Sequence, residues 1–576
     1  MPTRTYDEGK LSTRVWRQHF RIGILRAHSP DFELARILHT PQTSDVKKPA
    51  CQLLLLLLTA LPSFGQITNA DDVTRILAQA LTRASYYVES GLSTNPVVAL
   101  VDREGFVLGV RSLYTNANAF DVLDAITKAG TAAFLSSDQE AFSSRTAGFI
   151  VGQHFPPGIR NRPPGPLVGV NFSNMSFSDV NRFKDPSTYD PLAYGGGGTN
   201  GTPITGPAAL SGLAGSPGGV PLYQHGHLVG GVGAAVTGLV DPLAHIPALA
   251  DIQRTAKQRA DVDEDVALAG QIGFEPAKKI FGSQAFIDGI RVPYVDTRTK
   301  LDTNAVDNSI GYDVTPYHTV SSPSVNYPVV DLGDGIVGEM RAPIISYTNA
   351  SDPTLYISAD EVTNILKLAA QRAAITRAGI RLPRGVPAQV FICVVANPNQ
   401  MGSNPPILGT FRTPEATIFS WDVAVQKART AIYYSNTNRA YSSRTVGFLA
   451  QSLYPPGISG TAPGPLLRMQ EYFSLLPVGV TNVLNGVFFT ANDNTLSEPD
   501  PNLPNGITIF PGGFPLYRDG RLIGAIGVSG DGIDQDDIIA ASGTKNFLAP
   551  TAIRADRMRF RGARLPYAKF PRNPSI

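Results

Sequence analysis

The sequence has few of the residues that most readily reveal a functional site. Of its 576 residues, two are cysteine, two are tryptophan and eight are histidine, and 17% are charged. No Ser-His-Asp order, zinc-ligand spacing or dinucleotide-binding fingerprint is found along the chain. The sequence therefore predicts no catalytic centre of a familiar kind, and whether the protein is an enzyme stays open, with a non-catalytic role favoured.

The sequence also lacks a basic stripe. The first 65 residues hold nine Lys or Arg and five Asp or Glu, which leaves 40 basic and 42 acidic residues in the remainder. Nucleic-acid binding needs clustered positive charge to neutralise phosphates. We therefore expect no nucleic-acid partner.

A long apolar run is missing, but a short one lies near the N-terminus. Lys47 and Lys48 precede the apolar run 53–58, and the small residues Ser63 and Gly65 follow it. This pattern is typical of a secretory signal, with a buried core helix as the alternative. The run is too short to cross a bilayer, so we predict no membrane span in the mature protein.

We therefore interpret residues 1–65 as an N-terminal extension and signal peptide, with the signal at about 46–65. Translation then starts either at Met1 or near Val46, and the exported protein, periplasmic or secreted, begins near Gln66. Removal of the signal also removes Cys51, and with one cysteine left no internal disulfide can form. The remaining Cys393 lies in the apolar run 389–395, which predicts a buried strand and a core role rather than a nucleophile.

Glycine is plentiful, and it concentrates in two similar stretches, 218–233 and 512–530. Each predicts two short strands joined by a tight turn, His225-Gly226 in one and Asp519-Gly520 in the other. The glycines leave one face of the second strand nearly bare. Either another backbone or a flat ligand can approach such a face closely.

The two glycine-rich hairpins belong to a longer duplication. Lys128 and Lys427, Arg145 and Arg444, and Pro166 and Pro465 are each separated by 299 residues within similar motifs. A shared register over that distance indicates a duplicated domain. We assign domain 1 to 66–275 with loop insertions at 173–217 and 244–259, a packed connector to 276–357, domain 2 to 358–550, and a C-terminal tail to 551–576.

The periodicity of apolar residues predicts similar elements in both repeats. Helical spacing begins at Asp71 and again at Asp360, and each helix is followed by a strand pair. The first pair turns at 102–105. A second helix with a Lys-Ala-x-Thr-Ala motif, the glycine-rich hairpin and an acidic closing helix complete each repeat.

This order of elements resembles the GlcG/HbpS-like haem-binding protein family. The stretch 527–537, which starts Gly-Val-Ser-Gly, carries the most specific likeness, and the resemblance covers roughly 70–275 and 358–550. It implies an α/β (α+β) fold: two profilin-like α-β-α sandwich domains, each an antiparallel sheet flanked by helices. It also implies haem as a possible cofactor and homo-oligomers as a common state. The first repeat departs from the pattern, with Ala-Ala-Val-Thr-Gly at 234–238.

Several residues are candidates for ligand binding between the glycine-rich hairpin and the neighbouring helices. Arg145 and Arg444 suit recognition of a carboxylate, such as a haem propionate or a small organic acid, or else a helix cap or an ion pair with an acid. Lys128 and Lys427 suit anion contact or a snorkelling role. The candidate set is Lys128, Arg145, Gly218, Gly219, His225, His227, Lys427, Arg444, Gly512, Gly513 and Ser529.

Histidines offer a possible contact to haem iron, although no metal site is firm. On one strand, His225 and His227 would face the same side, and the alternative is an ordinary solvated hairpin. His154 is a further candidate ligand, and a surface or core role is its alternative. Acids near the closing helices resemble a cation cluster, but capping and the helix dipole explain them adequately. These acids are Asp263, Glu264, Asp265, Asp534, Asp536 and Asp537.

These observations favour an exported protein that binds haem, or a related flat and anionic small molecule, without catalysis. Its two domains would pack as an internal pseudo-dimer, with a higher homo-oligomer possible. A haem-degrading or organic-acid-processing enzyme is one alternative. A structural or partner-binding module of the cell envelope is another.

Overall fold

The structure is a computed structural model that describes most of the chain beyond the predicted signal peptide. The described residues are 65–151, 155–156, 165–167, 213–236, 261–315, 317–323, 327–383, 385–400, 403, 405–451, 453–456, 458, 460–466 and 508–569. The predicted signal peptide up to residue 64, Cys51, His154, the insertion 244–259 and most of the insertion 173–217 lie outside them. Every described residue belongs to one compact unit within Pro62–Ile576.

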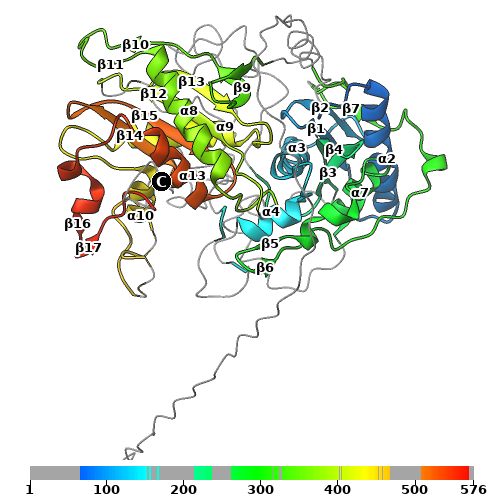
Figure 1. The fold of residues 1–576 in the computed structure, drawn as a ribbon. Coiled ribbons are helices and arrows are strands. Elements are labelled where there is room, and N and C mark those ends of the chain that lie inside the picture. Colours follow the sequence, from blue (N-terminus) through cyan, green and yellow to red (C-terminus); the bar gives the residue numbers. More distant parts are fainter. Residues whose placement is uncertain are drawn as a thin grey trace, which may run out of the picture. The chain divides into compact units, whose positions relative to one another are not determined.

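The first repeat is built on a five-stranded antiparallel sheet with the order β3-β4-β1-β2-β7 (Figure 1). Its strands are β1 (Val97–Asp102), β2 (Val107–Ser112), β3 (Gly219–Gln224), β4 (His227–Ala235) and β7 (Tyr312–Asp313). Its helices are α2 (Ala70–Glu89), α3 (Ala119–Leu135), α4 (Ser144–Ile150) and α7 (Val262–Gly270).

The second repeat follows the same plan with the order β14-β15-β12-β13-β9-β8. Its strands are β8 (Val329–Asp331), β9 (Val337–Ala342), β12 (Phe391–Ala396), β13 (Ile407–Arg412), β14 (Gly513–Arg518) and β15 (Arg521–Ser529). Its helices are α8 (Ala359–Ile375), α9 (Ser420–Tyr433), α10 (Ser443–Leu449) and α13 (Ile533–Gly543). The repeated order agrees with the duplication predicted from the sequence.

Each sheet lies between two helical layers. Helix α3 packs on one face of the first sheet, while α2 and α7 lie side by side on the other face, and α9, α8 and α13 do the same in the second repeat (Figure 1). Both faces of β1 are therefore buried, with Val97 and Ala99 on the α3 side and Val98 on the other. The predicted α/β fold of antiparallel sheets flanked by helices is confirmed.

Local sequence explains how these elements begin and turn. Asn69 caps α2 by accepting a hydrogen bond from the backbone of Asp71, and apolar residues at helical spacing form its buried face. The two glycine-rich hairpins turn at His225-Gly226 and Asp519-Gly520, where all four residues have positive φ between 48° and 85°. This is the geometry of a two-residue type I′ turn, so the predicted hairpins are confirmed. Cys393 is fully buried on β12, as predicted.

The segment predicted to be a connector contributes to both sheets. Its β7 adds the edge strand of the first sheet, and β8 and β9 extend the second. The remaining short elements between the repeats are η5 (Lys278–Ile280), η6 (Gly282–Gln284), β5 (Phe286–Ile287), β6 (Ile290–Arg291), η7 (Thr303–Ala305), β10 (Tyr347–Thr348) and β11 (Tyr356–Ile357).

Each repeat continues for about one more motif past the predicted domain ends at 275 and 550. Two 3-10 turns and a hairpin follow each closing helix, and in the second repeat they are η8 (Thr551–Ile553), η9 (Ala555–Arg557), β16 (Arg559–Phe560) and β17 (Ala563–Arg564). Ser143 donates to the carbonyl of Tyr294, and Ser442 donates to that of Tyr567. These matched bonds tie residues 276–294 and 551–567 to their own domains. The sequence signal was the repeated Pro-Tyr pair at the end of each segment.

Candidate ligand-binding site

In the first repeat, four of the candidate residues meet at one end of the sheet. Lys128 comes from α3, Arg145 from α4, and Gly218 and Gly219 from the start of β3. A Cβ atom on Gly218 would lie 3.3 Å from Cδ of Lys128 and 2.7 Å from Cβ of Asp263 at the start of α7. The absence of a side chain at Gly218 therefore lets the lysine and the acid approach each other.

The second repeat brings its matched residues together in the same way. Gly512 lies between Lys427 on α9 and Asp536 on α13, and a Cβ atom there would be 3.2 Å from Nζ of the lysine. The amide of Gly513 donates to Oγ of Ser443, which precedes Arg444 on α10, over 2.8 Å. The residues matched by the sequence register thus occupy equivalent positions in the two repeats.

The bare glycine face is filled by a helix backbone rather than by a ligand. A Cβ atom on Gly219 would lie 2.1 Å from the carbonyl oxygen of Lys128, and one on Gly527 would lie 1.9 Å from that of Ala424. Such distances are far below van der Waals contact, so only glycine lets the strand and helix approach this closely. The expected position of a flat ligand, between hairpin and helix, is therefore wrong.

Lys128 is buried between two carboxylates. Its Nζ lies 2.7 Å from Asp124, one helical turn earlier, and 2.7 Å from Asp263, and it donates to the carbonyl of Ala234 over 3.1 Å. Burial alone would lower the pKa of Lys128, but the two carboxylates raise it above its ordinary value. This lysine is a buried charged group and does not snorkel, contrary to one of the alternatives considered.

Lys427 has one carboxylate partner instead of two. Its Nζ lies 2.7 Å from Asp536 and 2.8 Å from the carbonyl of Val528, and Val423 stands where the first repeat has Asp124. Burial lowers the pKa of Lys427, and Asp536 offsets this only in part. Burial raises the pKa of Asp536 to about 6, even though Lys427 opposes the shift. With one carboxylate partner, the charged form of Lys427 is therefore stabilised less than the charged form of Lys128.

The two matched arginines both bind acids of their own domain. Arg145 forms a fork with Glu264 on α7, with distances of 2.8 and 3.1 Å, and both side chains are almost fully buried. Arg444 bonds Asp537 over 2.8 Å and Asp534 over 2.7 Å, and 18% of its side chain is exposed. The ion-pair alternative describes both arginines in this structure, and ligand binding by them stays a prediction.

The acidic residues near the closing helices pair with basic side chains, and none of the six is the side-chain cap of its helix, although five lie in the first turn, where the helix dipole favours them. The side-chain cap of α7 is Asp261, while α13 starts after Gly532 without one. All six acids pair instead with basic side chains: Asp263 with Lys128, Glu264 with Arg145, Asp265 with Arg83, Asp536 with Lys427, and Asp534 and Asp537 with Arg444. Within the described ranges, no group of three or more candidate ligands could hold a metal ion.

The histidine pair lies at the other end of the hairpin from the arginine and lysine. His225 occupies the turn with a φ of 52° and is exposed, so it does not share a strand face with His227. His227 Nδ1 lies 2.8 Å from Asp138. Six residues of β3 separate this turn from the cluster at Gly218, which corresponds to about 20 Å of extended strand. A joint site for the histidines and Arg145 is therefore wrong.

Ser529 ends β15 and is buried beside the lysine cluster of the second repeat. It pairs across the sheet with Phe391, and its neighbour Val528 supplies the carbonyl that accepts from Lys427. Its counterpart in the first repeat is Ala235, which occupies the same register opposite Val97. Ser529 thus lies near the candidate residues.

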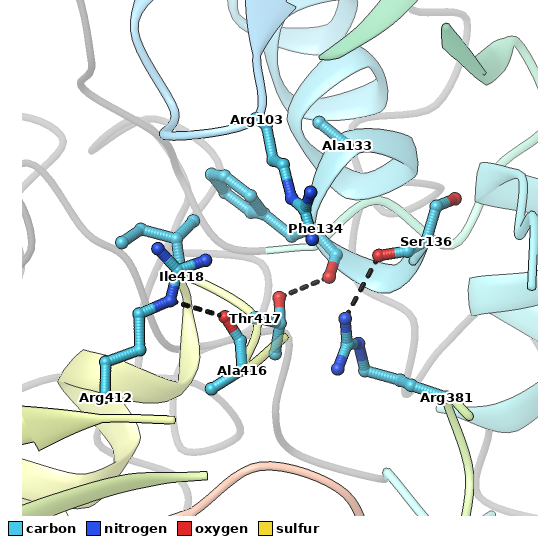
Figure 2. A pocket seen from close by; sticks show the side chains of 9 residues that line it. All are labelled: Arg103, Ala133, Phe134, Ser136, Arg381, Arg412, Ala416, Thr417 and Ile418. Carbon is cyan, nitrogen blue, oxygen red and sulfur yellow. Dashed lines mark hydrogen bonds between the residues drawn. The ribbon is translucent and has the colours of Figure 1, made fainter. Parts of the chain in front are cut away.

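The repeats contact each other through a polar seam that the sequence did not reveal (Figure 2). Thr417 donates to the carbonyl of Phe134, and Arg381 donates to that of Ser136 over 3.0 Å. Arg412, also from the second repeat, donates to the carbonyl of Ala416. The crevice between these residues has no space for a water molecule. It is a closed contact rather than a ligand site.

The strongest charges of this seam centre on Glu104 in the β1–β2 turn. Its carboxylate lies 2.7 Å from Arg341 on β9 and 2.8 Å from Arg412 on β13. Burial alone would raise the pKa of Glu104, but the two guanidinium groups hold it well below its usual value. Arg103, beside it, pairs with Glu415 over 2.7 Å. These residues lie in turns and strand ends without periodic signal, so sequence reasoning missed them.

The surfaces in this contact decide the symmetry of the predicted internal pseudo-dimer. A two-fold pair uses the same surface on both partners. In the seam, the β1–β2 turn of the first repeat meets Arg412 at the end of β13, whereas the matching strand end in the first repeat is Ser112. Ser112 bonds the nearby carbonyl of Tyr114. Among the described contacts, the repeats therefore meet head to tail through different surfaces.

The fold and the clusters define a tandem of α-β-α domains, each with a buried lysine, acids and close-packed glycines. Residues 388–545 match the family described as "Haem degrading protein HbpS-like". This range covers β12 to α13, so the second repeat is similar to HbpS-like proteins, as the sequence resemblance predicted. No curated protein matches the chain.

Several solved structures are similar to part of the chain. A PduOC–haem complex is 21% identical and covers 34% of this chain and 97% of its own, with a TM-score of 0.20. The protein ORFY of Klebsiella pneumoniae is 18% identical over 35% of this chain and 91% of its own, with a TM-score of 0.18. A double mutant of Streptomyces reticuli HbpS is 20% identical over 33% and 84%, with a TM-score of 0.19.

Proposed function

We propose that this protein binds haem or a related flat, anionic small molecule, and that its second repeat provides the site. The observation that carries this proposal is the HbpS-like match over 388–545, which includes both Lys427 and Arg444. The interior between hairpin and helix does not fit such a ligand, because the helix backbone fills it. The ligand therefore binds at the outer edge of the cluster.

Arg444 and Lys569 are the residues that suit the ligand's carboxylates. Both contact Asp534, over 2.7 and 2.9 Å, and the side chains of Lys569 and Asp534 are 43% and 41% exposed. A carboxylate from solution can replace this exposed acid and gain charge-assisted hydrogen bonds. The matching Arg145–Glu264 pair is closed to solvent, so the first repeat offers no equivalent access.

Haem would be held here by its carboxylates rather than by its iron. When bound, haem supplies two propionates and a redox-active iron. The second repeat contains no histidine, and His225 and His227 belong to the first repeat. The residues present fit the propionates, and no described imidazole of the second repeat fits the iron.

A pair of titrations tests this proposal. We expect haem and iron-free protoporphyrin to bind the protein with similar affinity, seen as saturable changes in the visible spectrum. Arg444→Gln or Lys569→Gln should weaken both by about 10-fold or more, because each removes a hydrogen bond to a charged group. Arg559→Gln, at an exposed position on β16, is the matched control. A flat titration with both porphyrins would contradict the proposal.

Haem degradation is a second candidate function, favoured by the description of the matched family. Loss of the haem spectrum in the presence of ascorbate, with release of a tetrapyrrole product, would support it. A stable spectrum under ascorbate would leave binding without turnover.

We also propose that the protein is exported and forms a homo-oligomer. The pattern at residues 46–65 supports export, and the native protein should begin near Gln66 when its N-terminus is sequenced. A native N-terminus at Met1 or Pro2 would argue against it. Within the part of the chain that the structure describes, no helix is long and apolar enough to cross a membrane. Sedimentation of the purified protein tests the oligomer.

A further inference from the structure

A cavity of about 240 Å³ lies where the two repeats meet, apart from the clusters described above. Glu140, from the loop between α3 and α4, and the segment 284–286 line it from the first repeat. Ile380 and Leu382, which precede β12, line it from the second. Its wall is therefore mixed: one carboxylate, an amide at Gln284, and apolar side chains.

Glu140 carries a buried oxygen atom without a partner. Its Oε2 is shielded from solvent and has no hydrogen-bond partner in the described structure. Buried polar atoms in native proteins almost always have a partner, so such an orphan calls for a missing group. Burial, together with the nearby Asp531, raises the pKa of Glu140 to about 7.

The charges behind Glu140 do not balance. Asp531 is fully buried, and its Oδ1 accepts from the backbone amides of Ile380 and Arg381 over 3.2 and 2.6 Å, while its Oδ2 has no partner. The guanidinium of Arg381 donates to the carbonyls of Ser136 and Glu415. Two carboxylates and one guanidinium group thus share this region. When both carboxylates are ionised, this region carries two negative charges and one positive charge, so one negative charge is left without a counterion.

We propose that this cavity binds a small organic ammonium ion, with its nitrogen paired to Glu140 and its carbon skeleton packed against Phe286, Ile380 and Leu382. A monocation supplies the missing charge, and its N–H groups can donate to the carboxylate of Glu140, which lines the cavity. An aromatic ring and two aliphatic side chains suit a carbon skeleton, and the ring also attracts a cation. The volume lies just below the usual range of drug-sized pockets, about 300–1,000 Å³, so the ligand is small.

Other ligand classes fit less well. An anion would add a third negative charge next to Glu140 and Asp531. A divalent metal needs several oxygen ligands, and no suitable group of three occurs among the described residues. The second repeat has Arg439 at the position of Glu140, so this acid belongs to the contact between repeats and not to the duplicated plan.

Calorimetric titration of the full chain at pH 8, with benzylammonium and its neutral isostere benzyl alcohol, tests the proposal. We expect benzylammonium to bind at least 10-fold more tightly than benzyl alcohol. Glu140→Gln should lose this preference, whereas Glu275→Gln, which removes an exposed acid of the neighbouring segment, should keep it. Ala285→Leu, which fills part of the cavity, should weaken both ligands.

Three results would overturn the proposal: no binding by the wild type, equal binding of the amine and the alcohol, or unchanged preference in a folded Glu140→Gln variant. A far-ultraviolet spectrum and an unfolding midpoint confirm that each variant is folded. Because haem and porphyrin carry carboxylates and bind elsewhere in the proposed function, failure of either proposal leaves the other intact.

Discussion

The two repeats place the same lysine in the same fold but hold its charge differently. Lys128 has two carboxylate partners, and its pKa is raised. Lys427 has one, and its pKa is lowered. The difference follows from one helix position, where Asp124 in the first repeat corresponds to Val423 in the second. The pKa of a buried lysine therefore rises here only where the acids around it outweigh the effect of burial.

The arginines repeat this contrast at the edge of each cluster. Arg145 and Glu264 are sealed, whereas Arg444 and Asp534 reach solvent. The arginine pair of the first repeat is thus closed to solvent, and that of the second repeat is partly open. This comparison explains why we assign ligand binding to the second repeat, and five predictions follow from it and from the rest of the structure.

The largest effect should come from removing the lysines. Lys128→Met leaves two buried acids without their cation and should cost about 3–5 kcal/mol of unfolding free energy. Lys427→Met leaves Asp536, which can take up a proton, and should cost only about 1–2 kcal/mol. Urea unfolding at pH 7 measures the loss of unfolding free energy in both variants. Equal losses would contradict the proposed difference between the two lysine clusters.

Adding a second carboxylate beside Lys427 tests the same explanation in the opposite direction. Val423→Asp gives Lys427 the second carboxylate that Lys128 has, and should raise the pKa of Lys427. Lysine-selective carbon NMR follows this titration. A pKa of Lys427 unchanged in a folded variant would show that the acid count is not the cause.

The contact between repeats should respond next. Glu104→Gln removes the carboxylate between Arg341 and Arg412 and should cost about 2–3 kcal/mol, because two buried guanidinium groups lose a partner. Arg103→Gln, which breaks a less enclosed pair with Glu415, should cost about 1 kcal/mol or less. Limited proteolysis should release the separate repeats faster from the first variant. Equal cleavage rates for the two variants would mean that Glu104 contributes no more than Arg103 to the stability of the contact between repeats.

Close glycine packing should have a smaller but clear effect. Gly527→Ala brings a Cβ atom against the carbonyl of Ala424 and should cost about 1–3 kcal/mol as the helix shifts. Gly520→Asn, in the open hairpin turn, is the control and should change stability little, since asparagine tolerates positive φ. Denaturant midpoints measure the stability of both variants. An unchanged midpoint for Gly527→Ala would mean that the helix can shift to accommodate the methyl group.

The pH dependence should show the smallest difference. The folded pKa of Asp536, about 6, lies above its ordinary value of 3.8, so the folded state binds more protons between these pH values. Its contribution to stability is therefore present below about pH 4 and is lost as pH rises through 6. Relative to Asp536→Asn, the wild type should lose roughly 1–3 kcal/mol over this range. A pH-independent difference would contradict the raised pKa.

Much of the fold could be predicted because it depends on local patterns. The type I′ turns need positive φ, and His-Gly and Asp-Gly at these positions indicated them. The register of 299 residues paired Lys128 with Lys427 and Arg145 with Arg444, and the structure places each pair in equivalent clusters. The acidic stretches were visible too, but their ion pairs were not, because capping is local and ion pairing is not.

The part that could not be predicted depends on which distant segments meet. Lys128 and Asp263 are 135 residues apart, and Glu104 and Arg412 are 308 apart. Contacts over such sequence separations produce no periodic pattern in the sequence. The same holds for β7, which is two residues long and joins the first sheet from the expected connector.

By itself, the sequence determined the duplicated plan, the order of helices and strands, and the positions where only glycine fits, since these follow from backbone preference and apolar period. The tertiary structure alone decided that helix backbones fill the bare faces, that six acids pair with basic side chains, and that the repeats meet head to tail in the described contacts. Burial makes each of those charges costly without a partner, and only the folded chain brings the partners together.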